Sequence, residues 1–345
     1  MANKLTGFWI DRPKMRLLLL AVAVLFAGCS SCGGGGGDDT GVTPVELPKF
    51  DAARAFADIE HQCDFGPRMP GSAGHEAQLA WMISTLSPLA DSLIQQPFSA
   101  TTPFGGPYDF TNLIAVFSSQ APGVTTMIGA HWDTRPVADE DPDPDLRDHP
   151  IPGANDGASG VAILLELARI FSQQPPPSPV YLAFFDAEDS GKRGSELPYI
   201  GFCMGSNYMA HNWPVQIEPP DRVIVLDLVG GQSKHNPRVP VRTDMGGNDY
   251  FDLRIEPNSQ AVAPQLVDHI WDIAEFLGHD AFKRSSQVGV IDDHIPFINA
   301  AGIPAVDIID FVPPVWHTVD DSPEYCDPDA LKQVGETMLG LVYGM

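Results

Sequence analysis

Acidic and histidine residues recur at five places that lie far apart in the chain. In order, these places are His131-Trp132-Asp133, Asn155-Asp156-Gly157, Asp186-Ala187-Glu188-Asp189, Asp227, and Trp316-His317-Thr318. Carboxylates and imidazoles without cysteine suit a catalytic zinc ion that keeps one coordination position open. Each residue alone is more readily explained as a turn, a surface acid or a structural histidine, but five in succession are not. The sequence therefore predicts a catalytic zinc centre built from these residues.

Short apolar, β-rich segments precede most of these residues and must position them. The segments cover 125–131, 180–185, 222–228 and 305–309, and two more cover 92–99 and 112–117. Helical patterns occur at 50–63, 76–86, 160–171, 261–277 and 330–343. Such alternation predicts a single-domain α/β sandwich whose mixed, mostly parallel sheet is flanked by helices. Because ligands bind beyond the carboxyl ends of parallel strands, we expect the acidic and histidine residues to meet there.

The N-terminal region predicts export and a lipid anchor. A basic stretch precedes an apolar run at 17–26, which is too short to span a bilayer and has the length of a signal sequence. Leu25-Phe26-Ala27-Gly28 then leads to Cys29, as in a bacterial lipobox. We therefore expect a lipoprotein signal peptide at 1–28, lipidation of Cys29, a glycine-rich tether at 29–48, and a catalytic domain at 49–345 in the periplasm, anchored to the membrane. The alternative is a simple cleavable signal or a short anchor.

The net charge and the cysteine content argue against two kinds of site, one for nucleic acid and one for zinc held by thiolates. The formal net charge is −25, which argues against electrostatic binding to nucleic acid. The predicted domain contains Cys63, Cys203 and Cys326, none of them in a CxxC pair, which argues against a thiolate zinc site. An oxidising compartment permits one disulfide among the three, and the sequence leaves the pairing open, as it does the oligomeric state.

Over residues 50–345, the five motifs resemble the zinc aminopeptidases that use two metal ions. The resemblance implies that Asp156 bridges two zinc ions and that Glu188 is the general base. It places His131 and Asp227 at one zinc, and Asp189 and His317 at the other. Asp189 stands where those peptidases usually have glutamate.

A closer resemblance is to the glutaminyl-peptide cyclotransferases, especially the bacterial type. It is carried by Phe184-Phe185-Asp186-Ala187-Glu188-Asp189, Asp292-Asp293-His294-Ile295-Pro296-Phe297 and Trp316-His317-Thr318-Val319-Asp320-Asp321. This resemblance implies one zinc held by Asp156, Asp189 and His317, with Glu188 carrying protons. It also implies that Asp227 and Asp292 join a hydrogen-bond network and that Trp316 and Phe311 contact the substrate. The animal cyclases have a histidine where Asp307 stands here.

The resemblance predicts cyclisation of an N-terminal glutamine, in a peptide or protein, to pyroglutamate with release of ammonia. The alternative is an aminopeptidase with a second zinc at His131 and Asp227. A non-enzymatic surface lipoprotein of the same fold is a third reading. It is disfavoured because the position of the general base and every ligand position hold suitable residues.

Overall fold

The computed structural model describes residues 47–119, 121–192, 201–232, 250–311 and 313–345. The predicted signal peptide, Cys29 and nearly all of the predicted tether lie outside these residues, so they stay predictions. None of the helices in the described part of the chain combines the length and the apolar character of a membrane span.

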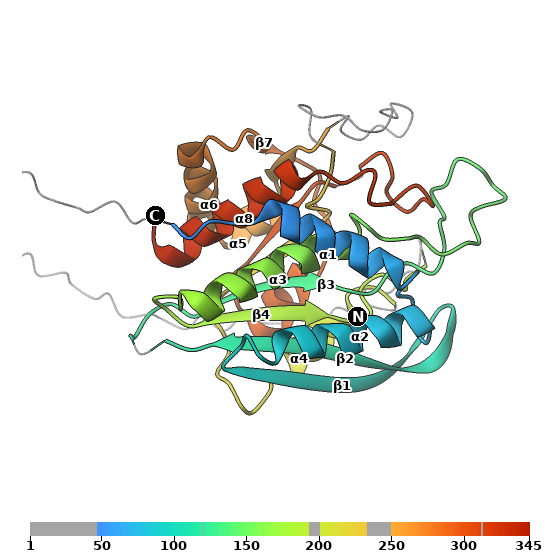
Figure 1. Ribbon diagram of the computed structural model, residues 1–345, viewed down its shortest axis with the longest axis horizontal. Coiled ribbons are helices and arrows are strands. Elements are labelled where there is room, and N and C mark those ends of the chain that lie inside the picture. The colour runs from blue at the N-terminus through green and yellow to red at the C-terminus, as the bar shows by residue number, and fades with distance from the viewer. Residues whose placement is uncertain (1–46, 120, 193–200, 233–249, 312) are drawn as a thin grey trace, which may run out of the picture. The chain divides into compact units, whose positions relative to one another are not determined.

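A six-stranded sheet runs through the domain in the order β1-β2-β4-β3-β5-β8 (Figure 1). Its strands are β1 (Ser92–Thr102), β2 (Gly105–Phe117), β3 (Thr126–His131), β4 (Val180–Phe185), β5 (Arg222–Asp227) and β8 (Ala305–Ile309). Strands β4, β3, β5 and β8 pair in parallel, whereas β1 and β2 form an antiparallel edge. A separate two-stranded sheet joins β6 (Leu253–Ile255) to β7 (Phe282–Ser286). The predicted mixed, mostly parallel sheet is confirmed.

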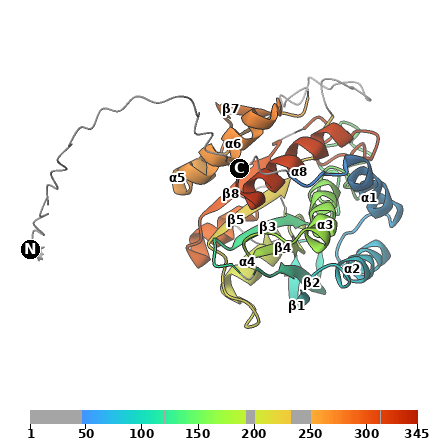
Figure 2. The same ribbon diagram turned by 60° about the vertical axis from the view of Figure 1, so that its left-hand side comes forward.

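Helices cover both faces of this sheet. They are α1 (Ala52–Asp64), α2 (Ala73–Leu86), α3 (Ala158–Gln173), α4 (Met204–His211), α5 (Pro257–Val262), α6 (Pro264–Leu277), α7 (His294–Pro296), the π-helical turn η1 (Phe297–Ala301) and α8 (Pro328–Tyr343). Figures 1 and 2 show α1, α3 and α8 together over one face. The other face packs against Met209 of α4 and Phe297 of η1. All residues of β3 and β4 are buried, which explains their nearly unbroken apolar sequences.

Two of the expected elements differ in extent, for physical reasons. The helix predicted at 261–277 is divided into α5 and α6 at Ala263, because Pro264 lacks a backbone N–H and can only begin a new helix. Strands β1 and β2 extend well past the predicted ends at 99 and 112, as a ribbon of exposed and half-buried residues. An exposed ribbon needs no apolar sequence, so hydrophobicity did not reveal it. Helix α4 was also missed.

Two glycines bring α3 close to the sheet edge that carries the acidic residues. Gly157 has a φ of +99°, and a Cβ there would lie 2.7 Å from the carbonyl oxygen of Asp133. A Cβ on Gly160 would lie 2.4 Å from the carbonyl oxygen of Leu226, at the end of β5. Because glycine tolerates both conditions, Asp156, which lies two residues before α3, comes close to the ends of β3 and β5.

A buried carboxylate joins α1 to α3. Glu166 has no exposed surface and accepts two hydrogen bonds of 2.6 Å from the guanidinium of Arg54. We expect Glu166→Ala to lower the free energy of unfolding by about 2 kcal/mol, a value moderated by the partial exposure of Arg54. Urea unfolding followed by circular dichroism measures the change.

Arg284 provides the matched control, because it pairs with Asp272 and Glu275 on the exposed surface. Arg284→Ala should change the free energy of unfolding by less than about 0.5 kcal/mol. Equal losses in the two variants would contradict the importance of the buried pair.

Candidate active site

The predicted site residues meet at the carboxyl ends of the parallel strands. His131 ends β3, Asp227 ends β5, and Glu188 and Asp189 follow β4 within four residues. His317 arrives on the loop after β8. Five segments that are distant in the sequence therefore contribute side chains to one edge of the sheet, as expected from the strand ends.

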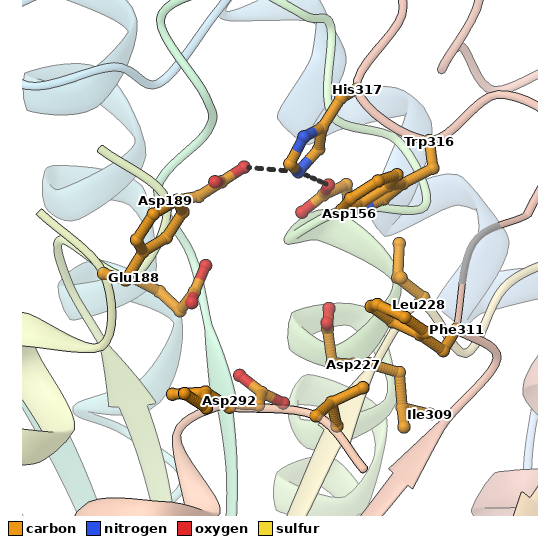
Figure 3. Close-up of a pocket in the computed structure, with 13 residues that line it drawn as sticks. Asp156, Glu188, Asp189, Asp227, Leu228, Asp292, Ile309, Phe311, Trp316 and His317 are labelled. Atoms are coloured by element: carbon orange, nitrogen blue, oxygen red, sulfur yellow. Dashed lines mark ion pairs between the residues drawn. The ribbon is translucent and has the colours of Figure 1, made fainter. Parts of the chain in front are cut away.

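These side chains surround a cavity of about 90 Å³ (Figure 3). Carboxylates of Glu188, Asp227 and Asp292 face it from below and beside the metal-ligand candidates. The apolar part of its lining consists of Phe202, Leu228, Val290, Ile291, Ile309, Phe311 and Trp316. Phe311 and Trp316 pack against each other, with ring centroids 5.7 Å apart. Both residues predicted to contact a substrate therefore line the cavity.

Asp156, Asp189 and His317 form one candidate metal group. His317 Nε2 lies 3.7 Å from Asp156 Oδ2 and 3.5 Å from Asp189 Oδ2. Both ion pairs are drawn in Figure 3. All three side chains are buried, and the backbone of His317 adopts a φ of +54°, a conformation that a non-glycine residue rarely adopts. The loop thus holds the backbone of His317 in a strained conformation, which directs the imidazole toward the carboxylates of Asp156 and Asp189.

His131, Asp156 and Asp227 form a second group, which shares Asp156 with the first. His131 Nε2 lies 3.3 Å from Asp156 Oδ1 and 3.2 Å from Asp227 Oδ1. Burial opposes protonation of this imidazole, but hydrogen bonds to Asp133, Asp156 and Asp227 raise its pKa well above the ordinary value. The imidazole lies between two carboxylates, whose negative charge favours its protonated form.

Two further aspartates hold the loops of the site through backbone hydrogen bonds. Asp133 accepts the N–H groups of Glu188 and Asp189, at 2.8 and 3.1 Å. Asp321 accepts those of Asn155 and Asp156, at 2.8 and 3.0 Å. Both aspartates belong to motifs visible in the sequence, but their partners are not visible there. Carboxylates bound to backbone in this way position the ligand candidates rather than bind a ligand themselves.

Arg135 and Asp139 form a chain of ion pairs that links Asp189 to His317 on the side away from the cavity. The sequence did not predict a role for either residue. Arg135, which has no exposed surface, donates from Nη1 to Asp189 Oδ1 at 2.7 Å. Its Nε and Nη2 donate to the two carboxylate oxygens of Asp139, both at 2.8 Å. Asp139 Oδ1 in turn lies 3.4 Å from His317 Nδ1. A carboxylate behind a metal-binding histidine fixes the ring so that its other nitrogen faces the metal.

Burial shifts the pKa of the catalytic candidates. It raises the pKa of Glu188 well above the ordinary value, and the negative charge of Asp189 adds to that shift. It raises the pKa of Asp189 to about 6 against the opposing charge of Arg135, and that of Asp227 to about 7 against its bond to His131. Crowded buried carboxylates favour binding either a proton or a cation.

The donor set fits a zinc ion at Asp156, Asp189 and His317. Within the described residues, Asp189 Oδ2 is buried and has no hydrogen-bond partner, although it faces His317. Two carboxylates and one imidazole form a ligand set typical of catalytic zinc, and three protein ligands leave a position open. A cation here would also offset the cost of burying the charge of Asp189 beside Asp156.

Asp292 and Asp307 lie under the cavity with His294. His294 Nδ1 is 3.5 Å from Asp307 Oδ2, and its Nε2 is 3.4 Å from Glu256 Oε2. Burial raises the pKa of Asp307 well above the ordinary value, and the charge of Asp292 adds to the effect. Asp292 therefore lines the cavity and joins it to a buried polar group that includes His294 and Asp307.

The cysteines of the domain are not cross-linked. No disulfide joins Cys63, Cys203 and Cys326 in the structure. The disulfide that the sequence permitted does not form among them.

A family model described as peptidase family M28 matches residues 112–342. Aminopeptidase YwaD of Bacillus subtilis is 26% identical over 63% of this chain, which spans only 40% of that protein. The glutaminyl-peptide cyclotransferase of Bos taurus is also 26% identical, over 79% of this chain and 76% of that protein. The resemblance to the cyclotransferase is thus the more complete along both chains.

Solved bacterial structures match over nearly their whole length. A zinc-dependent exopeptidase from Parabacteroides distasonis superposes with a TM-score of 0.77 at 32% identity, covering 87% of this chain and all of that one. The glutaminyl cyclase of Bacteroides thetaiotaomicron superposes with a TM-score of 0.76 at 32% identity, with the same coverage. The chain therefore belongs to peptidase family M28 and is a relative of the bacterial glutaminyl cyclases within it.

Proposed function

We propose that this protein is a zinc-dependent glutaminyl-peptide cyclotransferase, which converts an N-terminal glutamine into pyroglutamate and releases ammonia. The observation that carries the proposal is the small cavity, which presents carboxylates and the candidate zinc ligands to one place. Its volume is about 90 Å³. Such a space suits one short side chain. Cyclisation needs no more, because the attacking amine and the attacked carbonyl belong to the same residue.

The reaction is an intramolecular substitution at the γ-carboxamide of the substrate. The α-nitrogen forms a bond to the amide carbon, and the bond from that carbon to the amide nitrogen breaks. Since the substrate itself supplies proximity, the enzyme has to orient the chain, polarise the carbonyl and move protons. The apolar walls at Phe311 and Trp316 would exclude water and orient the glutamine side chain.

Glu188 is the group we assign to proton transfer. It would accept a proton from the attacking α-amine and return it to the departing nitrogen, which leaves as ammonia. Asp227 and Asp292 line the same cavity and would hold the α-amine by hydrogen bonds. Asp156, Asp189 and His317 would hold one zinc ion, which when bound supplies a Lewis acid for the γ-carbonyl.

The decisive test is an assay of the purified domain, residues 45–345, on a glutamine-initiated peptide by mass spectrometry. Loss of ammonia with the peptide otherwise intact is the expected result. Release of a free amino acid would instead support the aminopeptidase alternative and a second zinc at His131 and Asp227. A zinc-loaded protein that forms neither product would overturn the proposed substrate.

The wall formed by Trp316 should affect substrate affinity. Its ring stacks on that of His317, with centroids 3.9 Å apart, and lines the cavity. We expect Trp316→Ala to lower kcat/KM about thirtyfold, mainly through KM, because about 2 kcal/mol of apolar contact is lost. Trp316→Phe should recover most of the loss, and steady-state kinetics distinguishes the two. An unchanged KM in Trp316→Ala would show that the ring does not contact the substrate.

We propose that the domain works outside the cytoplasm, held to the membrane through Cys29. The signal sequence and the glycine-rich tether support this placement. Replacement of Cys29 by serine should release the protein from the membrane fraction of a bacterial host.

A further inference from the structure

Backbone hydrogen bonds hold residues 201–203, just before α4, against residues 188–190, which follow β4. Ser190 N donates to Gly201 O at 2.7 Å, and Cys203 N donates to Glu188 O at 2.9 Å. Between these bonds, Asp189 and Phe202 form an antiparallel bridge. The pairing places Cys203 opposite Glu188, at the residue that precedes α4.

The side chain of Cys203 contacts the carboxyl group of Glu188. Its Sγ donates to Glu188 Oε1 at 3.4 Å, and the cysteine has no exposed surface. Burial raises the pKa of this thiol well above its ordinary value, so the sulfur keeps its proton and acts as a donor. No other side-chain hydrogen bond to this carboxyl group is found among the described residues.

The backbone at this contact is strained on both sides. Cys203 has a φ of +50° and Ala187, next to Glu188, a φ of +59°. Residues other than glycine rarely adopt such angles, which persist where the surrounding structure imposes them. If Cys203 only filled space, a relaxed backbone could place an apolar side chain there equally well. The strain instead coincides with a thiol directed at the proposed proton carrier.

We propose that Cys203 is a positioning residue that holds the carboxyl group of Glu188 in one orientation through a thiol-to-carboxyl hydrogen bond. The inference rests on the proposed function, because it takes Glu188 as the group that accepts and returns the proton. A fixed carboxyl group keeps its reactive oxygen on the line between the attacking and the departing nitrogen. Loss of the thiol should therefore slow turnover without changing how the substrate binds.

Kinetics of two substitutions test this role. Cys203→Ala should lower kcat about tenfold, the effect of one hydrogen bond of ordinary strength. KM should stay within about twofold, because Cys203 does not itself line the cavity and contacts it only through Glu188. Cys203→Ser restores a donor and should regain most of the lost kcat. A serine variant as slow as the alanine variant would overturn the inference, because packing would then explain both.

Cys326→Ala is the matched control for loss of a buried thiol. Cys326 is also fully buried and does not line the cavity. Its substitution should leave kcat within about twofold, whatever it does to stability. Thermal unfolding of each variant confirms that all assays are run on folded protein.

An infrared measurement tests the contact independently of any activity. The S–H stretching band of Cys203 is assigned by its disappearance in Cys203→Ala. It should shift in Glu188→Gln, because the substitution replaces the carboxyl group that accepts the thiol hydrogen bond with a carboxamide. A band that does not respond to Glu188→Gln would overturn the proposal. If the wild-type protein releases no ammonia from glutamine peptides, the proposed function fails, but this band still reports on the contact.

Discussion

Replacement of Glu188 by glutamine is expected to lower kcat about a thousandfold while the protein keeps its zinc. Glutamine preserves the shape of the side chain but cannot accept a proton from the attacking amine. General acid–base catalysis by one group contributes on the order of a hundredfold to ten-thousandfold, which sets the size of the effect. Glu188 lies outside the group formed by Asp156, Asp189 and His317, so its substitution removes none of these three candidate ligands.

Ammonia release and zinc content, measured on the same preparations, check this expectation. Glu60→Gln, the same change on an exposed position of α1, serves as the control and should leave both quantities unchanged. Activity above about a tenth of the wild-type value would show that another group carries the proton. Zinc loss in Glu188→Gln would mean that the ligand assignment, rather than the proton carrier, is wrong.

His317→Ala is expected to weaken zinc binding more than a hundredfold and to abolish measurable cyclisation. Removing even a residue behind a metal ligand commonly costs on the order of ten- to a hundredfold in affinity, and a ligand should cost more. Without the imidazole, Asp156 and Asp189 would face each other as two buried carboxylates, and one of them would take up a proton instead of the metal. Competition with a chromogenic chelator measures the affinity.

His131→Ala separates one zinc from two. With one zinc at Asp156, Asp189 and His317, the wild type and His131→Ala should both bind about one equivalent by elemental analysis. With two zinc ions, the wild type would bind about two and His131→Ala about one. The second result would contradict the one-zinc proposal and support the peptidase-like arrangement.

Much of the fold could be predicted because its signals are local. The buried strands β3, β4 and β8 were recognised within one residue of their observed ends, since strands covered on both faces must be apolar throughout. Helix α4 and the outer half of the β1–β2 ribbon were missed. Their residues are only partly buried, so hydrophobicity carries a weak signal there. Pro264 could have indicated the boundary between α5 and α6, but the apolar pattern continues on both sides of it and favours one long helix.

The candidate site likewise contains residues that the sequence predicted and contacts that only the structure shows. The strand ends predicted that the acidic and histidine residues would meet at one edge of the sheet. The resemblance to the cyclotransferases implied the set Asp156, Asp189 and His317, and the structure brings these three side chains together. The sequence could not show that Arg135 reaches across to Asp189 or that Asp139 lies behind His317. Those contacts depend on the path of a loop, which no periodic pattern describes.

By itself, the sequence determined the chemical types of the site residues, their order along the chain and the strands that carry them. Only the tertiary structure decided which oxygen faces which partner. Asp133 shows the difference, because its carboxylate faces His131 Nδ1 at 3.6 Å and also accepts the backbone N–H groups of Glu188 and Asp189. A buried charge is stable only where distant segments supply donors or opposite charge. Those partners exist only after the strands have paired, so the roles of Asp133, Arg135 and Cys203 follow from the folded chain.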